Sequence, residues 1–180
     1  SFASIISSAK VNCTMMSEKE IRKAIEDIKR AIELGVRGFL VYDEGLLWIL
    51  GKMRKDGLLP KDIKFKASAH MSHANPASAK LLEMLGADSF NPARDLTLPM
   101  IAAIRAAIKI PIDVHTDNPP ASGGFIRTYE APQMVRIGAP IHLKCGNSVL
   151  PAHGTLPGAK EGVKMAEQAW LVVNMVKKYF

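Results

Sequence analysis

The sequence predicts an α/β protein whose parallel strands form a TIM-type (β/α) barrel, complete or incomplete, of about six strand–helix units. Strand and helix patterns alternate along the chain, with a repeat of about 25 to 35 residues. Apolar and polar residues alternate within the strands, and polar residues collect toward their C-terminal ends. These observations favour parallel strands joined by helical crossovers.

The elements follow one another without a break in this alternation. The first helix has Ser17 as N-cap and Glu20 to complete a capping box, and it ends at Gly35. The second helix ends at Gly57. The predicted strands are 9–14, 36–43, 63–70, 88–91, 110–116 and 140–146, and the predicted helices are 17–35, 44–57, 76–87, 96–108, 130–139 and 159–180.

Strand parity distinguishes a barrel from an open doubly wound sheet. One face of the strands is apolar, with Ile63, Phe65, Ala67, Ile112, Val114, Ile141 and Leu143. The other face is polar, with Lys64, Lys66, Ser68, His70, Asp113, His115, His142 and Lys144. Central strands of a doubly wound sheet are apolar on both faces, whereas barrel strands can turn a polar face to the mouth where active sites are built. A barrel is therefore the better prediction.

Six units are fewer than the eight of a complete barrel. We therefore expect residues 1–180 to form a single domain that is the C-terminal portion of a larger barrel, or a unit completed by another chain. The open edge strands of an incomplete barrel are usually covered. A homo-oligomer or a complex with a partner chain is the matching expectation.

Composition limits the classes of protein. The 180 residues have no apolar run long enough for a membrane span, which predicts a cytoplasmic protein with no membrane partner. The net charge of +7 is spread along predicted helices and only 6% of residues are aromatic, so nucleic acid is an unlikely partner. Solvated helix faces are the leading interpretation of this charge, and a small anionic ligand is the next. Cys13 and Cys145 are interpreted as reduced thiols.

Three residues are the predicted catalytic groups, namely Asp113, His115 and Lys144. His115 beside a carboxylate is a reasonable general acid or base. Lys144 at a barrel mouth can bind an anion, or can lose its charge through burial and form a Schiff base. A purely structural role is the alternative for each.

Seven further residues are expected to bind the substrate because they follow strands or lie in the loops of the same mouth. Arg127, beside the glycines at 123 and 124, can clamp an anion with two parallel hydrogen bonds. The predicted substrate-binding residues are Asp43, Glu44, His70, Asn91, Arg94, Arg127 and Asn147.

A divalent metal is a candidate cofactor. His70, Asp113 and His115 are the candidate ligands, since imidazole and carboxylate suit zinc, manganese or iron. Their spacing matches no metal-binding motif, so the cofactor is unknown from the residues alone.

Two segments resemble a known family. "GADSFNPARDLTLPMIAAIRAAIKIPIDVH" and "GGFIRTYEAPQMVRIGAPIHLKCG" are similar to the barrel domain of the collagenase-like peptidase family of unassigned catalytic type, the U-thirty-two family, over residues 35–146. The resemblance implies a barrel and a peptidase or related hydrolase. Related members resemble hydroxylation factors with iron–sulfur clusters, which two cysteines cannot hold, and no residue role is carried over.

The leading hypothesis is a hydrolase that acts on a small anionic or peptide-like substrate at the C-terminal mouth of the barrel. One alternative is an aldolase or lyase that uses Lys144. The other is a non-catalytic subunit that completes another chain's barrel.

Overall fold

A parallel five-stranded sheet forms the centre of the protein in the computed structural model, which describes residue 15 and residues 17–180. Its strands are β1 (Gly38–Val41), β2 (Lys64–Ala67), β3 (Ser89–Phe90), β4 (Ile112–His115) and β5 (Ile141–Lys144). The strand predicted at 9–14, together with Cys13, lies outside the described residues. The other five predicted strands are confirmed, each with shorter bounds than the residue pattern indicates.

The strands lie side by side in chain order, β1-β2-β3-β4-β5, and each neighbouring pair is parallel. A doubly wound sheet reverses its strand order at a switch point, whereas a (β/α) barrel adds each strand on the same side of the preceding one. The order found here is that of a barrel. The predicted parallel α/β architecture is therefore confirmed.

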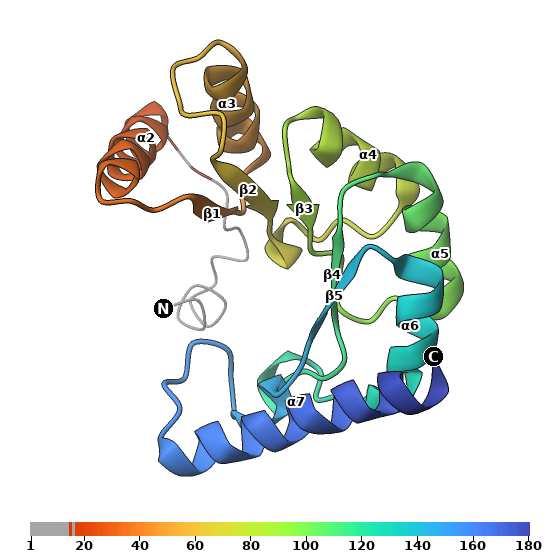
Figure 1. Ribbon diagram of the computed structural model, residues 1–180. Coiled ribbons are helices and arrows are strands. Elements are labelled where there is room, and N and C mark those ends of the chain that lie inside the picture. The colour runs from red at the N-terminus through yellow and green to blue at the C-terminus, as the bar shows by residue number, and fades with distance from the viewer. Residues whose placement is uncertain (1–14, 16) are drawn as a thin grey trace.

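Within the described residues, six helices alternate with the strands. They are α2 (Glu18–Glu33), α3 (Glu44–Lys55), α4 (Pro76–Met84), α5 (Leu98–Ala107), α6 (Ala131–Gly138) and α7 (Ala159–Tyr179). The start of α2 is as predicted, because the Ser17 side chain accepts a hydrogen bond from the Glu20 N–H. Figure 1 shows α3 to α6 along the outer side of the sheet and α7 across its lower end.

The hydrophobic core lies between the sheet and these outer helices. Phe65, Phe90 and Ile112 point into it from three neighbouring strands, where they meet Leu47 of α3 and Ile104 of α5, and all five are fully buried. Burying each such side chain contributes about 1.5–3 kcal/mol to the free energy of unfolding. Because successive strand residues point to opposite faces, this apolar packing directs the residues between them to the other side of the sheet.

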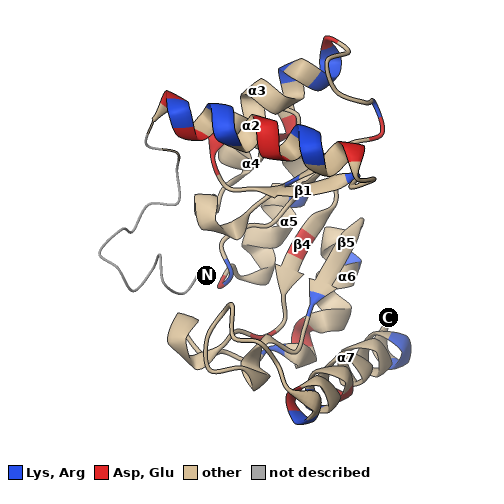
Figure 2. Cartoon of the chain, turned by 90° about the vertical axis from the view of Figure 1, so that its left-hand side faces the viewer, with Lys and Arg blue, Asp and Glu red and all other residues tan. Residues whose placement is uncertain are grey.

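The opposite side of the sheet is called the inner face here and carries Leu40, Lys66, Asp113, His142 and Lys144. Register places these residues on one side, since Leu40 pairs with Lys66 across β1 and β2, and Asp113 pairs with His142 across β4 and β5. Figure 2 shows this side in front of α5 and α6, with acidic colour on β4 and basic colour on β5. The predicted parity of these strands is confirmed.

The C-terminal end predicted for the strand at 63–70 places His70 in the wrong element. The pattern at 63–70 extends the strand to His70, but β2 ends at Ala67 and His70 lies in a short 3-10 helix, Ala69–Met71. The Ser68 side chain accepts a hydrogen bond from the His70 N–H, which turns the chain out of the sheet. Among the helices of the described residues, none is long and apolar enough to cross a membrane.

Candidate functional site

A cleft of about 270 Å³ opens at the C-terminal ends of the strands and is called the mouth cleft here. Active sites of (β/α) barrels lie at this end because the loops after the strands meet there. Its polar lining comes from the ends of all five strands and from the loops that follow them, and consists of Tyr42, Ser68, His70, Asn91, Arg94, His115, Lys144, Asn147 and His153. Six of the predicted site residues are in this set.

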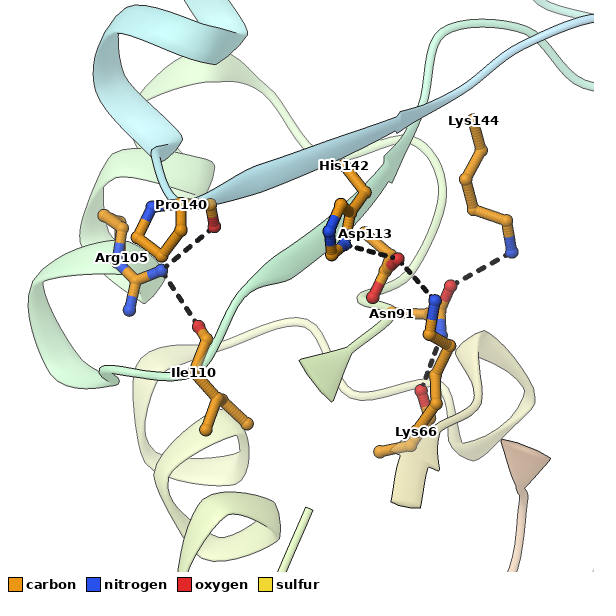
Figure 3. A network of polar contacts seen from close by, with 9 residues as sticks. Lys66, Asn91, Arg105, Ile110, Asp113, Pro140, His142 and Lys144 are labelled. Atoms are coloured by element: carbon orange, nitrogen blue, oxygen red, sulfur yellow. Dashed lines mark hydrogen bonds and ion pairs between the residues drawn. The ribbon is translucent and has the colours of Figure 1, made fainter. Parts of the chain in front are cut away.

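Lys144 and Asn91 make the central contact of the cleft. The Lys144 ammonium donates to Asn91 Oδ1 over 3.1 Å, and Asn91 Nδ2 donates to the Ala67 carbonyl oxygen over 2.8 Å (Figure 3). Because Asn91 Nδ2 donates to the Ala67 carbonyl oxygen, the amide oxygen of Asn91 faces Lys144. Burial lowers the pKa of Lys144, and Lys66 and Arg94 lower it further, although Asp113 acts in the opposite direction.

Arg94 holds His70 in its neutral form. Arg94 Nη2 lies 2.9 Å from His70 Nε2, and a guanidinium can only donate, so His70 Nε2 accepts and carries no proton. Burial first, and then the charge of Arg94, lowers the pKa of His70 from 6.5 to about 4. The Arg94 Nε–H is buried and has no partner among the described residues, which leaves a donor for a ligand.

His115 is the most deeply buried histidine of the cleft. It is 4% exposed, and its ring lies edge-on to the ring of His153 with 6.1 Å between centroids. Burial first, and then the charges of Lys144 and Arg94, lowers the pKa of His115 from 6.5 to about 3. The imidazole is therefore neutral at pH 7.

Two loops close the cleft, and buried polar contacts fix both of them. Asp117 Oδ2 accepts hydrogen bonds of 2.6 Å from the backbone N–H and the hydroxyl of Ser148. His153 Nε2 lies 3.0 Å from Asn118 Oδ1, and burial, with Arg94 and Lys144, lowers the pKa of His153. The loop after β4 thus positions the loop after β5.

Asp113 lies outside the cleft lining, on the inner face next to it. The carboxylate is 1% exposed, and its Oδ1 accepts from Lys66 Nζ at 2.7 Å and pairs with His142 Nδ1 at 3.1 Å. Figure 3 shows the side chains of Lys66 and His142 reaching this oxygen from two sides. Asp113 therefore joins β2, β4 and β5 through hydrogen bonds.

Residues 8–118, more than half of the chain, match the model of peptidase family U32. The chain belongs to peptidase family U32. The matched segment of this U32 chain includes His70, Asn91, Arg94, Asp113 and His115, and the family predicted from the sequence is confirmed.

Two solved structures are similar to this U32 chain. The U32 peptidase Mk0906 has 22% identity and a TM-score of 0.44, over 55% of this chain and 37% of that one. The YdjI aldolase from Escherichia coli K12 has 18% identity and a TM-score of 0.47, over 85% of this chain and 62% of that one. The chain thus spans less than two thirds of the length of either protein. No curated protein matches the sequence.

Three predicted substrate-binding residues of the U32 chain do not line the mouth cleft. Asp43 caps α3, with its oxygens accepting from the backbone N–H groups of Leu46 at 2.7 Å and Met15 at 2.9 Å. Glu44 pairs with His73 at 2.9 Å. Arg127 pairs with Glu130, and its Nη1 donates to the Leu96 carbonyl oxygen. Asn147, by contrast, lies in the lining as predicted.

The candidate metal ligands are not gathered in one place. Within residue 15 and residues 17–180, no three His, Cys, Asp or Glu side chains group closely enough to hold a metal ion. Asp113 is in contact with Lys66 and His142, and His70 is in contact with Arg94. A divalent metal as cofactor stays a prediction.

Five residues of this region are absent from the predicted catalytic and substrate-binding residues. Lys66 and His142 bind Asp113, and Tyr42, Ser68 and His153 line the mouth cleft. Strand parity places Lys66 and His142 on the face of Asp113, so the sequence does carry a signal for these two. No pattern in the sequence predicts that the loop of His153 folds back to the mouth cleft.

Proposed function

We propose that this U32 family chain is a hydrolase of a small anionic or peptide-like substrate, which binds in the mouth cleft. The observation that carries the proposal is the composition of the cleft, where two cationic side chains, Arg94 and Lys144, stand beside three imidazoles. The same two cations lower the pKa values of His70, His115 and His153. An anion here would be attracted to the cations and would favour protonation of the imidazoles.

The positive charges of Arg94 and Lys144 bind the carboxylate of the substrate. Arg94 is half-buried and has an unpartnered Nε–H among the described residues, and a guanidinium bonds carboxylates well in a dry site. Lys144 is fixed through Asn91, so its ammonium is already placed before a substrate arrives. Preorganised donors cost little conformational entropy on binding.

His115 supplies the base in this scheme. Its neutral ring takes a proton from water as the water oxygen bonds to the carbonyl carbon. The carbon–nitrogen bond then breaks, and the amine nitrogen takes up a proton as it leaves. A pKa of about 3 makes the free ring a weak base. The negative charge of a bound substrate raises the pKa of His115 toward the range in which proton transfer is efficient.

A binding experiment tests the anionic part of the proposal. N-acetyl dipeptides with a free carboxylate and the same peptides with a C-terminal amide are titrated calorimetrically. We expect the acids to bind at least about tenfold more tightly, which corresponds to about 1.4 kcal/mol. Equal affinities for acid and amide would contradict the role of Arg94 and Lys144.

A lyase that uses Lys144 is the second candidate. The observation that favours it is the lowered pKa of the half-buried Lys144 amine, since a neutral amine is the nucleophile that forms a Schiff base. Nζ would attack a substrate carbonyl, and water would leave as the imine forms. Borohydride reduction with an α-keto acid present, followed by peptide mapping, should then place the added mass on residue 144.

A subunit that completes another chain's barrel is a third candidate. The inner face of β1 favours it, because Leu40 on that face is 55% exposed. Light scattering tests this candidate. A monomer in solution that retains ligand binding would exclude it.

A further inference from the structure

The Asp113–His142 pair on the inner face is not used by the proposed function. Asp113 is buried, whereas the side chain of its partner His142 is 63% exposed. A carboxylate accepts hydrogen bonds only, so the contact of 3.1 Å places the imidazole proton on Nδ1. The Nε2 atom, which bonds to nothing among the described residues, is left with its lone pair toward open space.

His142 stands close to the mouth cleft. It precedes Lys144 by two residues on the same face of β5, a separation of about 6.6 Å along a strand. His142 and Lys66 line a second hollow of about 470 Å³ on the inner face. Leu40 lines both this hollow and the mouth cleft, so the two spaces adjoin.

Lys66 completes the arrangement. Its ammonium lies 2.7 Å from the same oxygen, Oδ1, that pairs with His142, so this one atom of Asp113 receives both donors. The second oxygen, Oδ2, is buried and makes no hydrogen bond within the described residues. A buried carboxylate fixed by a cation on one side and an imidazole on the other is an arrangement that holds the ring in one tautomer.

We propose that His142 is a catalytic residue, a second proton-transfer group whose ring Asp113 orients and which meets the substrate where it extends from the mouth cleft along the inner face. The position of the substrate rests on the proposed function above. Asp113 is then a positioning residue, although the sequence predicts it as a catalytic one.

Proton transfer by His142 completes the hydrolysis of an amide. His115 takes a proton from the attacking water as the oxygen bonds to the carbonyl carbon. The Nε2 atom of His142 takes up a proton from the solvent and passes it to the amine nitrogen as the carbon–nitrogen bond breaks. His115 then returns its proton to the solvent.

The test uses 4-nitrophenyl acetate, which needs a base but has no anionic group for Arg94 and Lys144 to bind. The neutral Nε2 takes a proton from water, the oxygen bonds to the acetyl carbon, and nitrophenolate leaves. We expect His142→Gln to lower the rate constant at least about tenfold and Asp113→Asn to lower it by a smaller factor. His73→Gln is the matched control, because His73 pairs with Glu44 and lines neither the mouth cleft nor the hollow.

Nitrogen-15 spectra of the histidine rings give a readout that does not depend on activity. Wild-type His142 should show the Nδ1–H form, and Asp113→Asn should shift the ring toward the Nε2–H form. Circular dichroism checks that each variant is folded. An Nε2–H ring in the wild type, or an ester rate within about twofold of wild type in His142→Gln, would overturn the proposal.

These results separate the two proposals. If the wild type cleaves no peptide-like substrate but its ester hydrolysis depends on His142, the proposed function is contradicted and the assignment of His142 as a proton-transfer group stands. If peptides are cleaved at the same rate by His142→Gln and wild type, the proposed function stands and the inference fails.

Discussion

Lys144 of β5 and Asn91, which directly follows β3, meet through a hydrogen bond of 3.1 Å although 53 residues separate them in the chain. The contact crosses the end of β4, so it requires the strand order β3-β4-β5. It also fixes the position of the Lys144 ammonium within the cationic cleft. The barrel order and the electrostatics of the site are thus linked by one pair of residues.

Replacing Arg94 should weaken substrate binding specifically. Arg94→Gln keeps much of the side-chain volume but removes the charge that faces the cleft, so KM for an anionic peptide-like substrate should rise at least about tenfold with little change in kcat. Arg136→Gln removes an arginine of α6 that bonds the C-terminal backbone oxygens of Tyr179 and Phe180, outside the cleft. Steady-state kinetics should show no change of KM in this control. A similar rise in both variants would mean that net charge alone matters.

The buried histidines should make the protein less stable in acid. The pKa of His115 is about 3 in the folded state and 6.5 in the unfolded chain, so between these values the unfolded state binds the extra proton. The free energy of unfolding therefore falls as pH falls through this window. The His115 contribution at about pH 5 amounts to about 1–2 kcal/mol.

Urea unfolding followed by tryptophan fluorescence measures this pH dependence. Between about pH 7 and about pH 5, the free energy of unfolding should fall by about 1–2 kcal/mol less in His115→Gln than in the wild type. His70, whose pKa is lowered to about 4, contributes in the same direction and remains in this variant. Identical pH slopes in the two proteins would show that His115 is not buried in neutral form.

Asp43 should act on stability and not on binding. Its Oδ1 caps α3 by accepting from the Leu46 N–H, so Asp43→Ala should lower the free energy of unfolding by about 1–2 kcal/mol. Asp43→Asn keeps a capping oxygen and should cost much less. Thermal unfolding of the two variants gives the comparison. If Asp43→Asn raised KM for an anionic substrate, Asp43 would belong to the binding site as the sequence predicts.

Two helical glycines should respond to alanine with opposite signs. A Cβ at Gly51 would lie 2.2 Å from the Leu85 carbonyl oxygen, because α3 and the end of α4 approach closely there. Gly51→Ala should therefore destabilise the protein by at least about 1–3 kcal/mol. A Cβ at Gly162 meets nothing within 4 Å, so Gly162→Ala in α7 should stabilise by about 0.5–1 kcal/mol. Denaturation midpoints with the same sign for both would contradict the packing of α3 on α4.

The sequence predicts the fold well because local signals and burial agree. The alternation of Ile112, Asp113, Val114 and His115 fixes which side chains face the helices, and a shift by one residue would bury Asp113 in the core. Helix caps such as Ser17 mark element boundaries to within a few residues. Parity and the regular alternation of strands and helices are therefore enough to predict most residues of the mouth cleft.

The sequence does not predict the residues of the site whose positions depend on loop geometry or on hydrogen bonds to groups nearby in the chain. Asp43 follows β1 as Asn91 follows β3, but Asp43 immediately precedes α3, and its carboxylate accepts a hydrogen bond from the backbone of that helix. Glu130 lies three residues after Arg127, and its carboxylate forms an ion pair with the Arg127 guanidinium. His153 reaches the cleft only because its loop folds back onto Asn118. No periodic pattern encodes such contacts.

The most direct measurement of the central claim is the incorporation of oxygen-18 from labelled water into the products of an N-acetyl dipeptide with a free carboxylate, followed by mass spectrometry. A hydrolase that works from the mouth cleft should place one solvent oxygen in the new carboxylate. Loss of His115 as base, in His115→Gln, should slow this labelling at least about a hundredfold. Absence of labelled product with the wild type, or equal labelling by the variant, would contradict the account.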